Sequence, residues 1–215
     1  MSNFDLNRYE SLFAKKIKEV AEKEEPAHDF LHFLRVVKIA KALCETEKGQ
    51  MEIVVPAAWL HDLVIIPKND PRRSMASRLS GQAAKEFLTK IEYPEIFIEE
   101  IAHAVEAHSF SANIPARTLE AKIVQDADRL DGLGAIGIAR CFAVAGGLRR
   151  AFYSEEDPLC ESRVPDDRQF TIDHFFVKLF KTANSMQTKT GQIEGKKRAE
   201  TMRKFLLDLK REIAQ

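Results

Sequence analysis

An adjacent histidine and aspartate, His61-Asp62, end a strongly apolar run in this sequence of 215 residues. Apolar neighbours such as Trp59, Leu60 and Leu63 would bury both polar side chains, and burial without partners is costly. A metal ion satisfies both groups, because neutral imidazole and carboxylate are good ligands and a cation offsets the buried negative charge. A His–Asp hydrogen bond inside a helical core would also satisfy them, and for an isolated dipeptide this ordinary interpretation is favoured.

Further candidate ligands lie on other predicted helices, namely His32 and the pair Asp126 and Asp128. Positions two apart on a helix point about 200° apart, so both aspartates cannot readily reach one ion. Asp126 lines up with Leu130 and with other residues of an apparently packed stripe, where it would orient a ligand or cap a neighbouring group. Helix phase therefore gives modest support to Asp128 as the ligand.

Helical periodicity extends over most of the chain and predicts the elements that must position these residues. Helices are expected at residues 4–24, 29–44, 51–65, 74–91, 94–108, 118–145, 171–186 and 192–213. Residues 146–169 look irregular, and no segment alternates with the period of a strand. Three glycines in the interior of 118–145 cost roughly 1 kcal/mol each relative to alanine, so they suggest close approach of another element. We expect an all-α fold in one domain, residues 1–215.

Composition limits the classes of partner. Lys plus Arg and Asp plus Glu number 33 each, so no global field attracts nucleic acid or an anionic membrane surface. No apolar run approaches the roughly 18 to 20 residues that span a bilayer, and the first residues lack the order of a secretory signal. Three widely spaced cysteines fit reduced thiols. We expect a cytoplasmic protein without stable nucleic-acid or membrane binding, and we leave a homodimer open.

The order His32, His61-Asp62, Asp128 resembles the HD-domain metal-dependent phosphohydrolase superfamily, most closely its uncharacterised bacterial YedJ-type members. The motifs that carry the resemblance are Ala27-His28-Asp29, His32-Phe33-Leu34-Arg35-Val36, Leu60-His61-Asp62, Pro67-Lys68-Asn69, His108-Ser109-Phe110-Ser111 and Gln125-Asp126-Ala127-Asp128-Arg129-Leu130. The resemblance extends over nearly the whole chain. It implies an HD-domain helical bundle, with a metal-site core at about 27–145 and additional C-terminal helices at about 146–215.

The resemblance also implies roles for single residues. It makes four residues the metal ligands: His32, His61, Asp62 and Asp128. Such a set suits a divalent ion, Mn²⁺, Mg²⁺, Co²⁺ or Ni²⁺, which would activate a water and polarise a phosphoryl group. The cations that could contact phosphate are Lys68 and Arg129, with Arg72 a weaker candidate. The general base is left open among Asp62, Asp70 and a metal-bound hydroxide.

Two further histidines, His103 and His108, could bind a second metal or a phosphate, or could simply be packed. His108 is the better candidate for the site, because Ser109 and Ser111 follow it. The leading hypothesis is a phosphohydrolase that cleaves a nucleotide or another small phosphorylated metabolite. Alternatives are a cyclic-nucleotide or alarmone hydrolase, and a metal-containing binding module without turnover.

Overall fold

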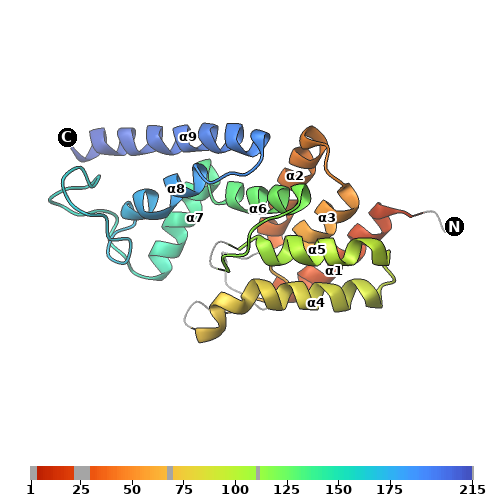
Figure 1. The fold of residues 1–215 in the computed structure, drawn as a ribbon. Helices are drawn as coiled ribbons and strands as arrows, with labels where there is room; N and C mark the ends of the chain where they lie inside the picture. Colours follow the sequence, from red (N-terminus) through yellow and green to blue (C-terminus); the bar gives the residue numbers. More distant parts are fainter. Residues whose placement is uncertain (1–3, 22–29, 67–69, 110–111, 215) are drawn as a thin grey trace. The chain divides into compact units, whose positions relative to one another are not determined.

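The computed structural model describes residues 4–21, 30–66, 70–109 and 112–214. In these ranges the regular elements are helices, and an isolated bridge between Ala151 and Phe170 is the β-type pairing (Figure 1). The predicted all-α class is therefore confirmed. The chain forms two compact units, residues 1–128 and 129–215. The expectation of a single domain over residues 1–215 stays a prediction.

The first unit is built around a short buried helix, α3. Its helices are α1 (Leu6–Ala21), α2 (Phe30–Glu47), α3 (Met51–Leu60), α4 (Ala76–Lys90), α5 (Glu95–Ala107) and α6 (Leu119–Asp131), of which α6 continues into the second unit. α3 packs against α1, α2 and α5. Its residues from Ile53 to Leu60 are all buried, as expected of a helix that is apolar all round.

The helix predicted for 51–65 ends earlier, at Leu60. His61 caps α3, the amide of Leu63 donates to the carbonyl of Leu60 at 3.1 Å, and the chain then continues without helical structure. The His61-Asp62 pair therefore lies where the chain leaves the helix.

α4 and α5 form a closely packed pair, which Figure 1 shows side by side. A short 3₁₀ helix, η2 (Pro71–Met75), precedes α4, and Asp70 caps it by accepting the amide of Arg72 at 2.8 Å. A Cβ atom at Gly81 would meet Cγ of Glu106 at 2.5 Å. The glycine therefore allows α4 to approach α5 closely at this point.

The single helix predicted for 118–145 is wrong, because the chain turns between α6 and α7 (Gly134–Gly147). Gly134 has φ +67°, which favours glycine, and a Cβ atom at Gly137 would collide with the carbonyl of Gly132. The glycines thus permit the turn itself. The expected approach of another element occurs at Gly134 alone, whose Cβ would meet Arg198 of α9 at 3.3 Å.

The second unit also contains η3 (Phe175–Leu179), α8 (Phe180–Ala183) and α9 (Lys189–Ile213), and α7 packs on α9. The connection from α7 to η3 is irregular, as predicted. Side chains order it: the buried carboxylate of Asp173 accepts two hydrogen bonds from Arg163, at 2.6 and 2.7 Å. In the described ranges no single helix is long and apolar enough to cross a membrane, although the pair α6 and α7 meets that test by length and composition.

Candidate metal centre

Three side chains from three helices converge in the first unit. His32 lies on α2, His61 caps α3 and Asp128 lies on α6, and one potential ligand atom of each lies within 4.8 Å of the others. The Nε2 atoms of the two histidines are 3.3 Å apart, and Oδ1 of Asp128 is 3.6 Å from His32 and 3.8 Å from His61. This group could hold a divalent cation.

The backbone fixes the state of His61. Its Nδ1 lies 2.8 Å from the carbonyl oxygen of Ala58, and because a carbonyl only accepts, Nδ1 carries the proton. Burial lowers the pKa of His61 to about 4, so the ring is neutral at pH 7. Nε2 therefore presents a lone pair toward His32 and Asp128, which is the state that a metal ligand requires.

Asp62 lies at the edge of this group. Its Oδ2 is 3.8 Å from Nε2 of His61, and its Oδ1 is 3.4 Å from Nε2 of His108. The side chains of Asp62 and Asp128 are 21% and 28% exposed, whereas those of His32 and His61 are 3% and 0% exposed. The two histidines are thus the buried part of the group, and the two carboxylates are its solvent-accessible part.

His108 contacts Asp62 at the edge of this group, and its role at the site stays a prediction. It caps α5, and its Nδ1 lies 2.6 Å from the carbonyl oxygen of Val105. Burial acts to lower the pKa of His108, but the hydrogen bond to Asp62 and the charges of Asp62 and Asp128 outweigh burial and raise the pKa to about 9. In the absence of a bound cation, His108 is therefore a protonated donor to Asp62.

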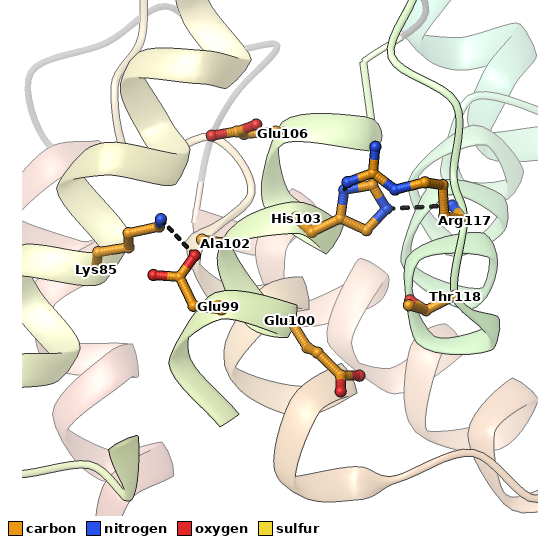
Figure 2. A pocket seen from close by; sticks show the side chains of 8 residues that line it. All are labelled: Lys85, Glu99, Glu100, Ala102, His103, Glu106, Arg117 and Thr118. Carbon is orange, nitrogen blue, oxygen red and sulfur yellow. Dashed lines mark hydrogen bonds and ion pairs between the residues drawn. The ribbon is translucent and has the colours of Figure 1, made fainter. Parts of the chain in front are cut away.

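His103 lies elsewhere. Its Nε2 accepts the backbone N–H of Arg117 at 3.1 Å, and burial, followed by the charge of Arg117, lowers its pKa. His103 lines a cavity of about 320 Å³. Figure 2 shows its lining residues, which are Lys85, Glu99, Glu100, Ala102, His103, Glu106, Arg117 and Thr118. None of the three converging residues lines this cavity.

The candidate phosphate contacts are placed as follows. Lys68 lies outside the described residues, so its role stays a prediction. Arg129 directly follows Asp128, and its guanidinium donates to the carbonyl and the hydroxyl of Ser185 at 2.7 and 3.1 Å. Arg72 is exposed and holds the carboxylate of Asp70, and its hydrogen bonds lower the pKa of Asp70 to about 2.

Two supporting side chains were not anticipated from the sequence. The amide of Gln125, on α6, donates to the carbonyl of Ala107 at 2.7 Å, next to His108. Ser80, on α4, bonds both backbone groups of Val64, two residues after Asp62. Gln125 lies in the quoted Gln125–Leu130 motif, which was a usable signal, whereas nothing in the local sequence distinguished Ser80.

Comparison with known proteins gives consistent matches. Residues 29–133 match the HD domain. The uncharacterized protein YpgQ of Bacillus subtilis (strain 168) is 31% identical over 202 residues, which cover 92% of this chain and 90% of YpgQ.

Solved structures extend the match to the fold. An HD-superfamily hydrolase from Bacillus thuringiensis superposes with a TM-score of 0.75 at 30% identity, covering 96% of this chain and 97% of that one. Bacillus subtilis YpgQ in complex with ADP superposes with a TM-score of 0.72 at 32% identity, covering 93% and 97%. The fold is that of HD-superfamily hydrolases, and the chain belongs to the HD-domain family.

Proposed function

We propose that this protein is a metal-dependent phosphohydrolase that cleaves a nucleotide or another small phosphorylated metabolite. The observation that carries the proposal is the convergence of Nε2 of His32, Nε2 of His61 and Oδ1 of Asp128, with separations of 3.3 to 3.8 Å. With Asp62 beside them, these residues offer two imidazoles and two carboxylates. That set suits a six-coordinate Mn²⁺, Mg²⁺, Co²⁺ or Ni²⁺ with positions left for water and a phosphate oxygen.

The donor set fits a cation better than it fits a proton. A proton on His32 could bridge the two Nε2 atoms, because His61 offers a lone pair there. Such a bridge would leave the carboxylate of Asp128 only 3.6 and 3.8 Å from two ring nitrogens, without a hydrogen bond of normal length to either. A divalent ion would use all three groups at once and offset the carboxylate charge.

When bound, the ion lowers the pKa of a coordinated water and polarises the phosphoryl group. Neighbouring residues of the chain hold the proposed ligands His61 and Asp62 in position. The carbonyl of Ala58 holds His61 in its ligand tautomer, and His108 holds Oδ1 of Asp62 while Oδ2 faces His61. Asp70 is a poor general base, because Arg72 occupies its carboxylate and keeps its pKa at about 2. Asp62 is therefore the better acid–base candidate.

The nucleotide part of the proposal is supported by similarity. YpgQ, which matches this chain over more than nine-tenths of both lengths in its crystal structure, was crystallised with ADP. Lys68 and Arg129 are proposed to contact the substrate phosphate, since each is a positively charged residue within a motif that resembles the family.

A metal analysis combined with a substrate panel tests the proposal. The panel contains nucleoside mono-, di- and triphosphates, cyclic nucleotides, an alarmone and a colour-producing phosphate ester, each with and without Mn²⁺. We expect the wild type to bind metal, to hydrolyse at least one nucleotide and to stop on chelation, and His61→Ala to do none of these. A wild type that binds no metal, and that no added ion activates, contradicts the proposal. Metal and nucleotide binding without turnover would instead indicate a binding module.

A further inference from the structure

Two side chains hold the described part of the segment that follows Asp62: Ser80 bonds to the backbone of Val64, and the guanidinium of Arg73 donates to the carbonyl of Ile66. Beyond the turn that joins Leu63 to Leu60, the backbone of Val64 bonds to the hydroxyl of Ser80, on α4. The N–H of Val64 donates to Oγ at 3.0 Å, and Oγ donates to the carbonyl of Val64 at 3.3 Å. Ser80 is 0% exposed, so water cannot replace it without a rearrangement.

We propose that Ser80 is a positioning residue for Asp62. Val64 is two residues from Asp62, so the two hydrogen bonds fix the direction in which the chain leaves α3. Asp62 must keep its two oxygens toward His61 and His108, at 3.8 and 3.4 Å, and a small rotation of this segment would separate them. The inference rests on the proposed function, in which Asp62 is a metal ligand.

The neighbouring residue on α4 strengthens the inference. Gly81 allows α4 to approach Glu106 on α5, two residues before His108. Adjacent positions of α4 therefore contact the segment that carries Asp62 and the helix that ends at His108. α4 thus packs against both the segment that follows Asp62 and the helix that precedes His108, and Ser80 supplies the hydrogen bonds to the first of these.

The chain offers two matched controls. Ser77, one turn earlier on the buried face of α4, is 1% exposed, and its hydroxyl has no hydrogen-bond partner among the described residues. Ser77→Ala therefore removes the same atom from the same helix without losing a bond. Tyr93→Phe removes a buried hydrogen bond to the backbone, because the Tyr93 hydroxyl donates to the carbonyl of Glu52 at 2.6 Å. Glu52 lies at the opposite end of α3 from His61.

The experiment compares Ser80→Ala, Ser77→Ala and Tyr93→Phe with the wild type. Calorimetric titration gives the Kd for Mn²⁺ alone, hydrogen exchange of the metal-free protein reports the Val64 amide, and thermal melting reports stability. We expect Ser80→Ala to weaken Mn²⁺ binding about tenfold, as other supporting partners of metal ligands do, and to speed exchange at Val64. Ser77→Ala should stay within about twofold of the wild-type Kd. Tyr93→Phe should melt earlier with its Kd equally unchanged.

The inference is overturned if Ser80→Ala binds Mn²⁺ within about twofold of the wild type, or if Tyr93→Phe weakens binding as much. If Ser80→Ala does not fold, Ser80→Cys takes its place, since sulfur keeps a weak donor and acceptor of similar size. An intermediate loss of affinity supports the inference, and wild-type affinity overturns it. A wild type that binds no Mn²⁺ contradicts the proposed function instead, and slow, unchanged exchange at Val64 in Ser80→Ala would then overturn the positioning role separately.

Discussion

The Nε2 atom of His32 lies 3.3 Å from the Nε2 atom of His61, although the two rings come from different helices. Both histidines are buried, and His61 is held neutral with its lone pair facing His32. Because Nε2 of His61 offers a lone pair there, a positive charge between the two rings, from a proton on His32 or from a cation, would stabilise this arrangement. Asp128, on a third helix, supplies the negative charge that favours a divalent ion over a proton.

Added Mn²⁺ should stabilise the wild type and not His61→Ala. A ligand that binds only the folded state at 100 times its Kd adds about 2.7 kcal/mol to the free energy of unfolding. We therefore expect Mn²⁺ to raise the melting temperature of the wild type, and a chelator to reverse the increase. His103→Ala is the control, because His103 lies in a separate cavity, and it should respond as the wild type does. An equal response in His61→Ala would place the metal elsewhere.

The neighbouring aspartates should respond differently to removal of their charge. Asp128 is one of the three converging residues, whereas Asp126 is 0% exposed and is not one of them. Asp128→Asn should lose Mn²⁺ binding in a titration, with little loss of stability because its side chain is 28% exposed. Asp126→Asn should lower the melting temperature and retain Mn²⁺. A metal-free Asp126→Asn beside a metal-loaded Asp128→Asn would reverse the assignment.

The sequence favoured Asp128 over Asp126 chiefly because Ala127-Asp128-Arg129-Leu130 resembles an HD-domain motif, and helix phase gave modest support. Residues two apart point about 200° apart, and the packed stripe that contains Asp126 could be recognised from its apolar members. The same geometry separated His103 from His108, which are about 140° apart on a regular helix. His108 indeed contacts Asp62, and His103 does not belong to that group. Positions on one helix are thus well determined by local spacing.

Contacts between distant segments were not predictable in this way. The hydroxyl of Ser80 meets Val64 only because α4 folds back against the end of α3. The sequence around Ser80 contains no motif that indicates this contact. The turn at Gly132 was missed for a different reason. Glycine in a helix costs only about 1 kcal/mol, so the apolar periodicity on either side outweighed it in the prediction of one continuous helix.

Arg129→Ala should lower kcat/KM by more than tenfold, a loss of about 1.4 kcal/mol of transition-state stabilisation. The reason is that its cation directly follows Asp128 and is proposed to contact phosphate. Arg129 also bonds the carbonyl and hydroxyl of Ser185, so a purely structural role must be separated. Ser185→Ala loses the hydroxyl contact with Arg129 and the hydroxyl's own hydrogen bond to the carbonyl of Thr182, keeps the carbonyl contact with Arg129, and should keep kcat/KM within about twofold. If Arg129→Ala melts earlier with unchanged kcat/KM, the arginine is structural.

The cysteines should be alkylated slowly by iodoacetamide in the folded protein. Burial raises the pKa of Cys44 and of Cys141 to about 11, and burial and Asp173 raise the pKa of Cys160 to about 12. An unfolded thiol of pKa about 8.5 is roughly a quarter thiolate at pH 8, against about a thousandth for a pKa of 11. Because a raised pKa keeps the proton on the folded chain, native alkylation should rise only as the pH approaches 11. Mass spectrometry with and without urea measures this, and equal rates at pH 8 would contradict it.

Two glycines of α7 should respond in opposite directions to substitution by alanine. A Cβ atom at Gly137 would collide with the carbonyl of Gly132, so Gly137→Ala must shift backbone at the turn after α6. We expect it to destabilise the protein by about 1 to 3 kcal/mol, as overpacking does. Gly146 lies on the same helix with nothing within 4 Å of a Cβ atom, so Gly146→Ala should be neutral or stabilising by up to about 1 kcal/mol. Urea unfolding measures both changes. Equal changes in stability at the two positions would mean that helix propensity, rather than the collision with the carbonyl of Gly132, determines the effect of Gly137→Ala.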